Sequence, residues 1–205
     1  MLAQVYVMRD IQSWATPDER ALALTLAREI LASGTDDPEA LRCAGHAMSY
    51  LGHDYSAAFT ALNRALRLNP NSALVLNTLG HVHCAANDPE PAFDYLRRAM
   101  RLSPLDPKFA IMLEGLGLAH MLKGETVLAL PLLQRAVQEW PTYVSAHRML
   151  ILALVRLGQL AEAREAAARL LENIPSYHGT GAEFFKNREF AAELQHALAI
   201  SGIAE

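Results

Sequence analysis

Residues 73–106 read ALVLNTLGHVHCAANDPEPAFDYLRRAMRLSPLD and contain the pattern that decides the fold. Two stretches with leucines and small residues at helical spacing are separated by the turn signal NDP at 87–89. Pro104 closes the segment, and Pro70 stands 34 residues before it. Because proline ends a helix, the segment predicts one pair of helices with a turn between them and a stop at Pro104.

The same pattern recurs along the chain with a period near 34 residues. Successive intervals of 34, 37 and 34 residues separate four prolines, Pro70, Pro104, Pro141 and Pro175. The same intervals separate four alanines, Ala58, Ala92, Ala129 and Ala163. Glycines have nearly the same spacing at the positions where the two helices of a pair would meet, Gly45, Gly80 and Gly117. The repeat predicts four helix pairs, at 38–72, 73–106, 107–143 and 144–177.

The ends of the chain fit the same scheme. Residues 1–37 read as a degenerate first pair, whose second helix starts at Thr16 with Glu19 three residues on, as in a capping box. Residues 178–205 read as a loop, which includes a glycine-rich turn at 179–181, and a capping helix stopped by Gly202. The extra three residues of the third unit predict a first helix about one turn longer at its N-terminal end. We therefore expect eleven helices, no strand and one domain over 1–205: an all-α right-handed solenoid of about five helix pairs plus a cap.

Composition narrows the class of function. The 205 residues are 52% hydrophobic and only 7% aromatic, the net charge is −4 and the pI is about 6.1. No basic field favours nucleic acid or an anionic membrane. No stretch has the form of a signal peptide or a membrane span. Two cysteines, Cys43 and Cys84, argue against a disulfide framework. We expect a cytoplasmic protein that binds neither nucleic acid nor membrane.

The alanine, glycine and proline phase resembles that of tetratricopeptide-repeat proteins. More narrowly, the amino-acid sequence of the repeat units is similar to the C-terminal repeat region of bacterial class III adenylate/guanylate cyclases and of some transcriptional regulators. An example is DDPEALRCAGHAMSYLGHDYSAAFTALNRALRLNPNSA at 36–73. The resemblance covers the whole chain and implies a helical binding array. In those proteins the catalytic or DNA-binding domain precedes the repeats, and all 205 residues here are used by helical pairs, so the resemblance implies no cyclase activity.

The resemblance also implies which side chains face the concave groove, because fixed positions of each first helix do so in this repeat. Carried over by phase, the candidate partner-binding residues are Arg42, His46, Tyr50, Asn77, His81, Glu114, Leu118, Met121, Leu122, Arg148, Leu152, Val155 and Arg156. The N-terminal half of this set is polar and rich in histidine, and the C-terminal half is apolar.

An apolar stretch such as Leu118 to Val155 should not lie bare in water. Three interpretations stay open for it: a docking site for an apolar helix or peptide, cover by the chain's own C-terminal helix or loop, or self-association. Phe184 and Phe185 are expected to anchor the terminal segment against the array. A homodimer is a further alternative, with Tyr6, Val7 and Ile11 of the first helix as the candidate edge.

Other chemistries have little support. Binding of a peptide through its C-terminal carboxylate is disfavoured, because positions 46 and 81 are histidine where this binding mode expects asparagine, and the predicted groove has no lysine. His81 and Cys84 could share a metal at i, i+3 spacing, but a groove histidine beside a buried thiol is the simpler interpretation. The same pair lacks an orienting carboxylate for nucleophilic catalysis. We therefore expect no catalytic residue, metal or cofactor, and a protein or peptide partner. The alternative is a regulatory or dimerising module related to the cyclase and regulator regions.

Overall fold

The computed structural model describes residues 2–12, 14–175, 177 and 182–203, and in them the chain forms eleven helices and no strand. The predicted all-α solenoid is thus confirmed. The first six helices are α1 (Leu2–Ile11), α2 (Pro17–Ala32), α3 (Pro38–Tyr50), α4 (Tyr55–Leu68), α5 (Ala73–Ala85) and α6 (Pro89–Leu102). The others are α7 (Phe109–Leu122), α8 (Thr126–Glu139), α9 (Val144–Arg156), α10 (Leu160–Asn173) and α11 (Arg188–Ile200). The predicted turn at 179–181 lies outside the described residues.

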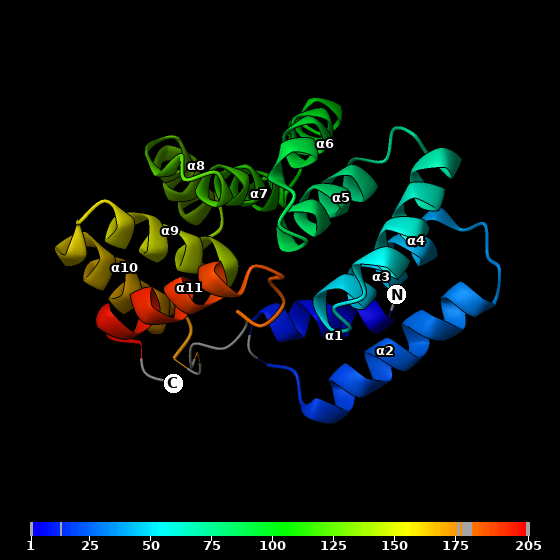
Figure 1. Cartoon of the computed structure of the whole chain (residues 1–205), viewed down its shortest axis with the longest axis horizontal. Helices are drawn as coiled ribbons and strands as arrows, with labels where there is room; N and C mark the ends of the chain where they lie inside the picture. Colours follow the sequence, from blue (N-terminus) through cyan, green and yellow to red (C-terminus); the bar gives the residue numbers. More distant parts are fainter. Residues whose placement is uncertain (1, 13, 176, 178–181, 204–205) are drawn as a thin grey trace.

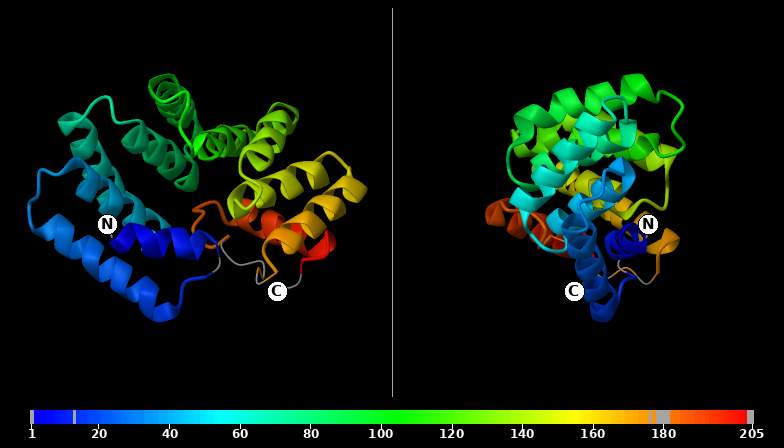
Figure 2. Two further views of the ribbon diagram at one scale, coloured as in Figure 1. Left: turned by 180° about the vertical axis from the view of Figure 1, so that it is seen from behind. Right: turned by 90° about the vertical axis from the view of Figure 1, so that its right-hand side faces the viewer.

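The helices stack as pairs along a curved array (Figure 1). Helices α3, α5, α7 and α9 pack side by side as the inner layer, and each contacts its own partner, α4, α6, α8 or α10, on the outer side. Helix α1 lies across the hollow of the curve, and the segment leading to α11 reaches the same hollow from the other end (Figure 2). Helix α1 and the segment before α11 therefore both lie on the concave side.

Small residues set the distance between the two helices of a pair, as the repeat predicted. A Cβ atom added at Gly80 would lie 2.5 Å from Cγ of Leu96, and one added at Gly117 would lie 2.6 Å from Cδ2 of Leu133. The repeating alanines of the outer helices are fully buried: Ala58, Ala92, Ala129 and Ala163. A larger side chain at any of these positions would force the pair apart, because protein cores are close-packed.

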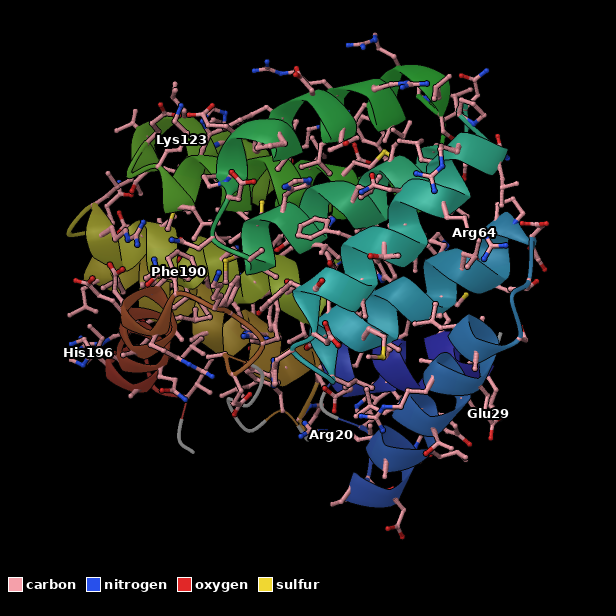
Figure 3. The ribbon with its side chains drawn as sticks, turned by 45° about the vertical axis from the view of Figure 1, so that its right-hand side comes forward. Arg20, Glu29, Arg64, Lys123, Phe190 and His196 are labelled. Atoms are coloured by element: carbon pink, nitrogen blue, oxygen red, sulfur yellow. The ribbon has the colours of Figure 1, made fainter. Side chains whose placement is uncertain are left out.

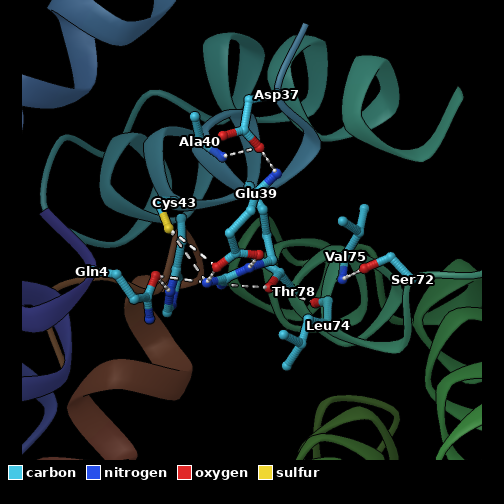
Figure 4. Close-up of polar contacts among 11 residues, drawn as sticks. Gln4, Asp37, Glu39, Ala40, Cys43, Ser72, Leu74, Val75 and Thr78 are labelled. Atoms are coloured by element: carbon cyan, nitrogen blue, oxygen red, sulfur yellow. Dashed lines mark hydrogen bonds and ion pairs between the residues drawn. The ribbon is translucent and has the colours of Figure 1, made fainter. Parts of the chain in front are cut away.

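Local signals start and stop the helices. Thr16 accepts a hydrogen bond from the Glu19 backbone N–H at 3.3 Å, and the Thr16 N–H donates to Glu19 Oε2 at 2.9 Å, so the predicted capping box is confirmed. Two further caps, Asp37 on α3 and Ser72 on α5, appear in Figure 4. In the first full unit the left-handed residue that ends the helix is His53, with φ of 52°, rather than Gly52.

The predicted extension of the third unit is wrong. Helix α7 has 14 residues against 13 in α3 and α5, so it is not a turn longer. The extra residues form turns at 103–108 instead. Asp106 stabilises these turns, because its Oδ1 accepts a hydrogen bond from the Lys108 N–H at 2.8 Å and its carbonyl accepts one from the Phe109 N–H at 2.9 Å.

Candidate partner-binding cleft

The C-terminal half of the concave surface is covered by the chain's own terminal segment. Leu118, Met121 and Leu152 are at most 2% exposed. They belong to one core with Phe185, Phe190, Leu194 and Leu198 of the terminal segment. Of the three interpretations of the apolar stretch, the structure therefore shows cover by the chain's own C-terminal part.

Polar contacts tie this cover to the inner helices. The Arg156 guanidinium donates from Nε to Glu193 Oε1 of α11 at 2.6 Å and from Nη1 to the Met121 carbonyl at 2.6 Å. It also lies over the ring of Phe190, which Figure 3 places in α11 beside α9. Leu122 and Val155 are half-buried against the same core.

The segment before α11 continues across the hollow to the N-terminal half of the array. The ring of Phe184 packs on Tyr50 of α3, with 4.6 Å between the ring centroids. The Tyr55 hydroxyl donates to the Phe184 carbonyl, and the Lys186 N–H donates to the Ala85 carbonyl at 2.8 Å. The predicted anchoring role of the two phenylalanines is confirmed, since Phe185 is only 1% exposed.

Helix α1 covers part of the N-terminal half with polar contacts. The Gln4 side-chain oxygen lies 3.2 Å from His46 Nδ1 and accepts a hydrogen bond from Arg42 Nη1 at 3.3 Å. Gln12 spans the hollow to α9, donating to the Thr142 carbonyl at 3.1 Å and accepting from the Val144 N–H at 3.3 Å. Sequence reasoning missed these glutamines, because nothing in the repeat period couples the first helix to a segment 130 residues on.

The proposed dimer edge is also used within the chain. Val7 is fully buried and Ile11 is 9% exposed, in the same core as inner-layer residues, so they are not free to pair with a second copy. The residues that α1 turns outward are Leu2 and Val5, each about half exposed.

Arg42 is engaged within the chain. Its guanidinium donates from Nε to Glu39 Oε2 at 2.8 Å and from Nη2 to Glu39 Oε1 at 2.5 Å (Figure 4). Thr78 Oγ1 lies 3.4 Å from Nη1. The bidentate pair uses two of the five N–H donors, and Gln4 and Thr78 accept from Nη1, so Arg42 stabilises the wall of the cleft more than it offers free charge.

A buried carboxylate lies at the centre of the concave surface. Glu114, 1% exposed, accepts hydrogen bonds from Ser145 Oγ at 2.9 Å and from His81 Nε2 at 3.0 Å, and Tyr143 Oη lies 3.4 Å away. His81 Nδ1 lies 2.9 Å from the Asn77 carbonyl, so both ring nitrogens face acceptors. Burial lowers the pKa of His81, but the hydrogen bond and charge of Glu114 outweigh it and leave the pKa raised. His81 is thus fixed by one hydrogen-bond contact within its own helix, α5, and by another with α7 of the next pair.

His46 has the opposite electrostatic setting. Burial, together with the positive charges of Arg42 and His81, lowers the pKa of His46 to about 3. The ring is therefore neutral near pH 7 and donates a hydrogen bond to the amide oxygen of Gln4, which has no proton to give in return.

Between α1 and the inner helices a cleft of about 310 Å³ remains. It is lined by four of the predicted groove residues, Arg42, His46, Asn77 and His81. Gln4, Met8 and Ile11 of α1 form the facing wall, and Leu74, Lys108, Ile111 and Tyr143 contribute further lining residues. Within the described part of the chain, the buried Oδ1 atom of Asn77 has no hydrogen-bond partner. The remaining predicted groove residues lie deeper: Tyr50 and Arg148 line a smaller cavity with Glu114 and Leu118.

The environment of Cys84 does not favour nucleophilic chemistry. Its thiol is fully buried, and burial followed by the charges of Glu114 and Asp88 raises its pKa well above the ordinary value. Among the described residues, no three His, Cys, Asp or Glu side chains are grouped so that they could hold a metal ion. Over the same residues no helix is both long and apolar enough to cross a membrane.

Comparison with known proteins gives the following similarities. Two family models described as tetratricopeptide repeat match residues 45–107 and 120–179. The cell division cycle protein 27 homolog of Caenorhabditis elegans is 30% identical over 129 residues, which are 63% of this chain and 16% of that protein. The chain therefore spans about one sixth of the length of that relative.

Solved structures show the same fold. A thermophilic TPR protein of Thermus thermophilus superposes with a TM-score of 0.69 at 22% identity, over 96% of this chain and 99% of its own. PilW, a type IV pilus biogenesis factor, superposes with a TM-score of 0.67 at 19% identity, over 98% of this chain and 89% of PilW. MamA of Desulfovibrio magneticus RS-1 superposes with a TM-score of 0.59 at 26% identity, over 85% of this chain and 96% of the MamA chain.

Proposed function

Because this chain is built of tetratricopeptide repeats, we propose that it is a non-catalytic scaffold that binds a segment of another protein in the cleft between α1 and the inner helices. Proteins of this repeat family typically act as non-enzymatic scaffolds that bind proteins or peptides. The observation that carries the proposal is the open cleft of about 310 Å³ lined by Asn77, whose buried carboxamide oxygen has no partner among the described residues. Neither nucleic acid nor membrane is among the proposed partners, since the net charge is −4.

The walls of the cleft favour an extended segment over a helix. Helix α1 contacts α3 and faces α5 across the cleft, so a helix about 10 Å wide with its side chains could not enter between them without displacing α1. An extended peptide offers backbone N–H and C=O groups at regular intervals, and the Asn77 carboxamide lines the cleft as a hydrogen-bonding group for one of them. Leu74 and Ile111 line the same cleft and would contact an apolar side chain of the peptide.

The charges of the cleft argue against recognition of a strongly anionic peptide. Arg42 is neutralised by Glu39, and His81 by Glu114. Among the described cleft residues, Lys108 is the cation without an ion pair, which leaves room for one acidic side chain at most. The partner segment is therefore expected to be apolar and near neutral, with at most one carboxylate.

The proposal is tested by photo-crosslinking followed by affinity measurement. A benzophenone amino acid at Leu74, which is 45% exposed at the cleft, should form a crosslink to a partner that the same group at Arg101, on the outer face of α6, does not form. With that partner isolated, Asn77→Ala should weaken binding about tenfold, which is about 1.4 kcal/mol. Arg101→Ala is the matched control. Equal affinity for wild type and Asn77→Ala would contradict the proposal.

The regulatory alternative is supported by a different observation. The similarity to a far longer relative shows that arrays of this kind occur inside longer proteins. In that setting the array would dimerise or sense a partner for an attached output domain, as the resemblance to cyclase and regulator regions suggests. Light scattering distinguishes this alternative: a dimer that Val5→Asp, on the outward face of α1, converts to a monomer would favour it over the scaffold.

A further inference from the structure

A second groove lies on the outer side of the array, away from the cleft described above. It encloses about 500 Å³ between α8 and α10, and α9 forms its floor. Figure 1 shows α9 between these two outer helices, so the groove runs along three helices of adjacent pairs. Leu150 and Leu154 contribute apolar side chains to the floor, and Leu130 and Val137 do so from α8. Neither α1 nor α11 contributes to its lining.

Helix α8 extends this apolar surface outward. Val127 is 72% exposed, and Pro131 one turn further on is also exposed. By the 3.6-residue period they fall on the same stripe as Gln134, which lines the groove. In α6, 37 residues earlier, the matching positions are Glu90 and Asp94. Helix α8 thus exposes apolar side chains at the positions where the equivalent helix α6 carries carboxylates, which indicates a contact surface.

The two ends of the groove differ in charge. At one end lie Glu162 and Gln159, whose backbone N–H donates to the Leu154 carbonyl at 2.9 Å. At the other end lie His147 and Arg169, and Arg169 forms an ion pair with Glu165, a further lining residue, at 3.8 Å. The Nε2 atom of His147 donates to the Pro141 carbonyl at 2.8 Å, which makes Nδ1 an acceptor. Within the described residues, His147 Nδ1 and Gln159 Oε1 are buried acceptors without a donor.

We propose that this groove binds an amphipathic helix of a partner protein, with its apolar ridge against Val127, Leu130 and Val137 of α8 and its basic end at Glu162. The stripe from Val127 to Gln138 spans roughly 16 Å at about 1.5 Å per residue, which is the length of about three helical turns. Two parallel outer helices over an apolar floor form a trough that accepts the ridge of a third helix. A basic C-terminal turn placed at Glu162 also suits the dipole of the incoming helix, so this helix would run antiparallel to α10.

The proposal is independent of the concave cleft and can be tested with a designed peptide. The probe is a fluorescein-labelled helical peptide of about 18 residues, with leucines at i, i+4, i+7 and i+11, glutamates in its first turn and lysines in its last. Its affinity for the full chain is measured by fluorescence anisotropy. A peptide of the same composition with the leucines distributed around the helix is the control, and it should bind at least about tenfold more weakly.

Exposed residues of the groove allow variants that leave the fold intact. We expect Val127→Asp and Glu162→Lys each to weaken binding about tenfold. Arg164→Glu, an exposed change on the opposite face of α10, and Asn77→Ala in the concave cleft should leave the affinity unchanged. Circular dichroism of each variant verifies that it is folded.

Four outcomes would overturn the proposal. One is no difference between the probe and its leucine-scrambled control. Another is equal weakening by Glu162→Lys and Arg164→Glu, which would show that binding does not depend on the groove face of α10. The third is a wild-type dimer in light scattering that Val127→Asp dissociates, because the groove would then hold a second copy of this chain. The last is loss of probe binding in Asn77→Ala, which would place the peptide in the concave cleft.

Discussion

The two halves of the concave surface are covered in different ways, and the difference follows from the side chains that each half presents. The C-terminal half presents Leu118 and Leu152, and phenylalanines and leucines of the terminal segment pack in the same core and leave these two leucines at most 2% exposed. The N-terminal half presents Arg42 and His46, and a glutamine of α1 meets them with hydrogen bonds while a cleft stays open. Apolar surface gains free energy from any close contact, but a buried polar surface gains it only where each group finds a partner.

The largest expected effect tests the apolar cover. Leu152→Ala should lower the free energy of unfolding by about 2–5 kcal/mol, because it leaves a cavity in the core shared by α9 and the terminal segment. Leu74→Ala, at an inner-surface position that is 45% exposed, should change it by less than about 0.5 kcal/mol. Urea denaturation measures both. Similar small effects of the two changes would mean that the terminal segment does not cover α9 in solution.

The next effect concerns the buried carboxylate between the halves. Glu114→Gln keeps the shape but removes the charge that faces His81, and it should cost about 1–3 kcal/mol of unfolding free energy. The pKa of His81 should fall at the same time, since the group that raises it is gone. Titration by NMR follows the ring of His81, and the exposed change Glu172→Gln serves as the control. An unmoved His81 pKa would refute the pairing.

The contact of Gln12 across the hollow is expected to have an effect of similar size that is confined to one end of the chain. Gln12→Ala removes two hydrogen bonds to the backbone of the segment before α9, each worth about 0.5–1.5 kcal/mol. Amide hydrogen exchange should rise in α1 and at the Val144 N–H, but not in α10. Gln195→Ala, exposed on α11, is the matched control. Exchange that rises equally throughout the chain would show a global effect instead of release of α1.

The last expected effect is a pH dependence, which is small near neutral pH and grows as the pH falls. The pKa of His46 is about 3 in the folded chain against 6.5 for the ordinary group, so below about pH 6 the unfolded chain binds a proton that the folded chain does not. Stability contributed by this site should fall by about 1.4 kcal/mol per pH unit as the pH drops. The pKa of His81 is raised, so His81 acts in the opposite direction. Urea midpoints of wild type and His46→Asn between about pH 7 and pH 4 should diverge, and parallel curves would contradict the assignment.

Contacts inside a helix pair and between neighbouring pairs could be predicted from the sequence, because the repeat fixes them. The glycine contact of Gly80 with Leu96 and the capping box of Thr16 with Glu19 are examples. The conformation of the insertion before α7 could not be predicted, because Pro107 is compatible with a helix start and with a turn. In the structure the side chain of Asp106 stabilises the turn by accepting a hydrogen bond from the Lys108 N–H.

The candidate site was predictable only in part. The phase of the repeat gave Arg42, His46, Asn77 and His81 as residues of one surface, and the structure brings them together around one cleft. The wall opposite them, formed by Gln4 and Met8, follows from the path of α1 across the hollow, and no spacing in the sequence encodes that path. Whether these residues bind a partner stays a prediction.

The contacts of Gln12 with residues 142–144 and of Phe184 with Tyr50 have a consequence for how the chain folds. An array in which each pair touches only its neighbours can nucleate anywhere and fray from its ends. Here residues about 130 positions apart must meet before either end is secure. Such distant contacts raise the contact order and slow folding. They also link the first and last pairs, so the molecule should unfold in one cooperative transition rather than pair by pair.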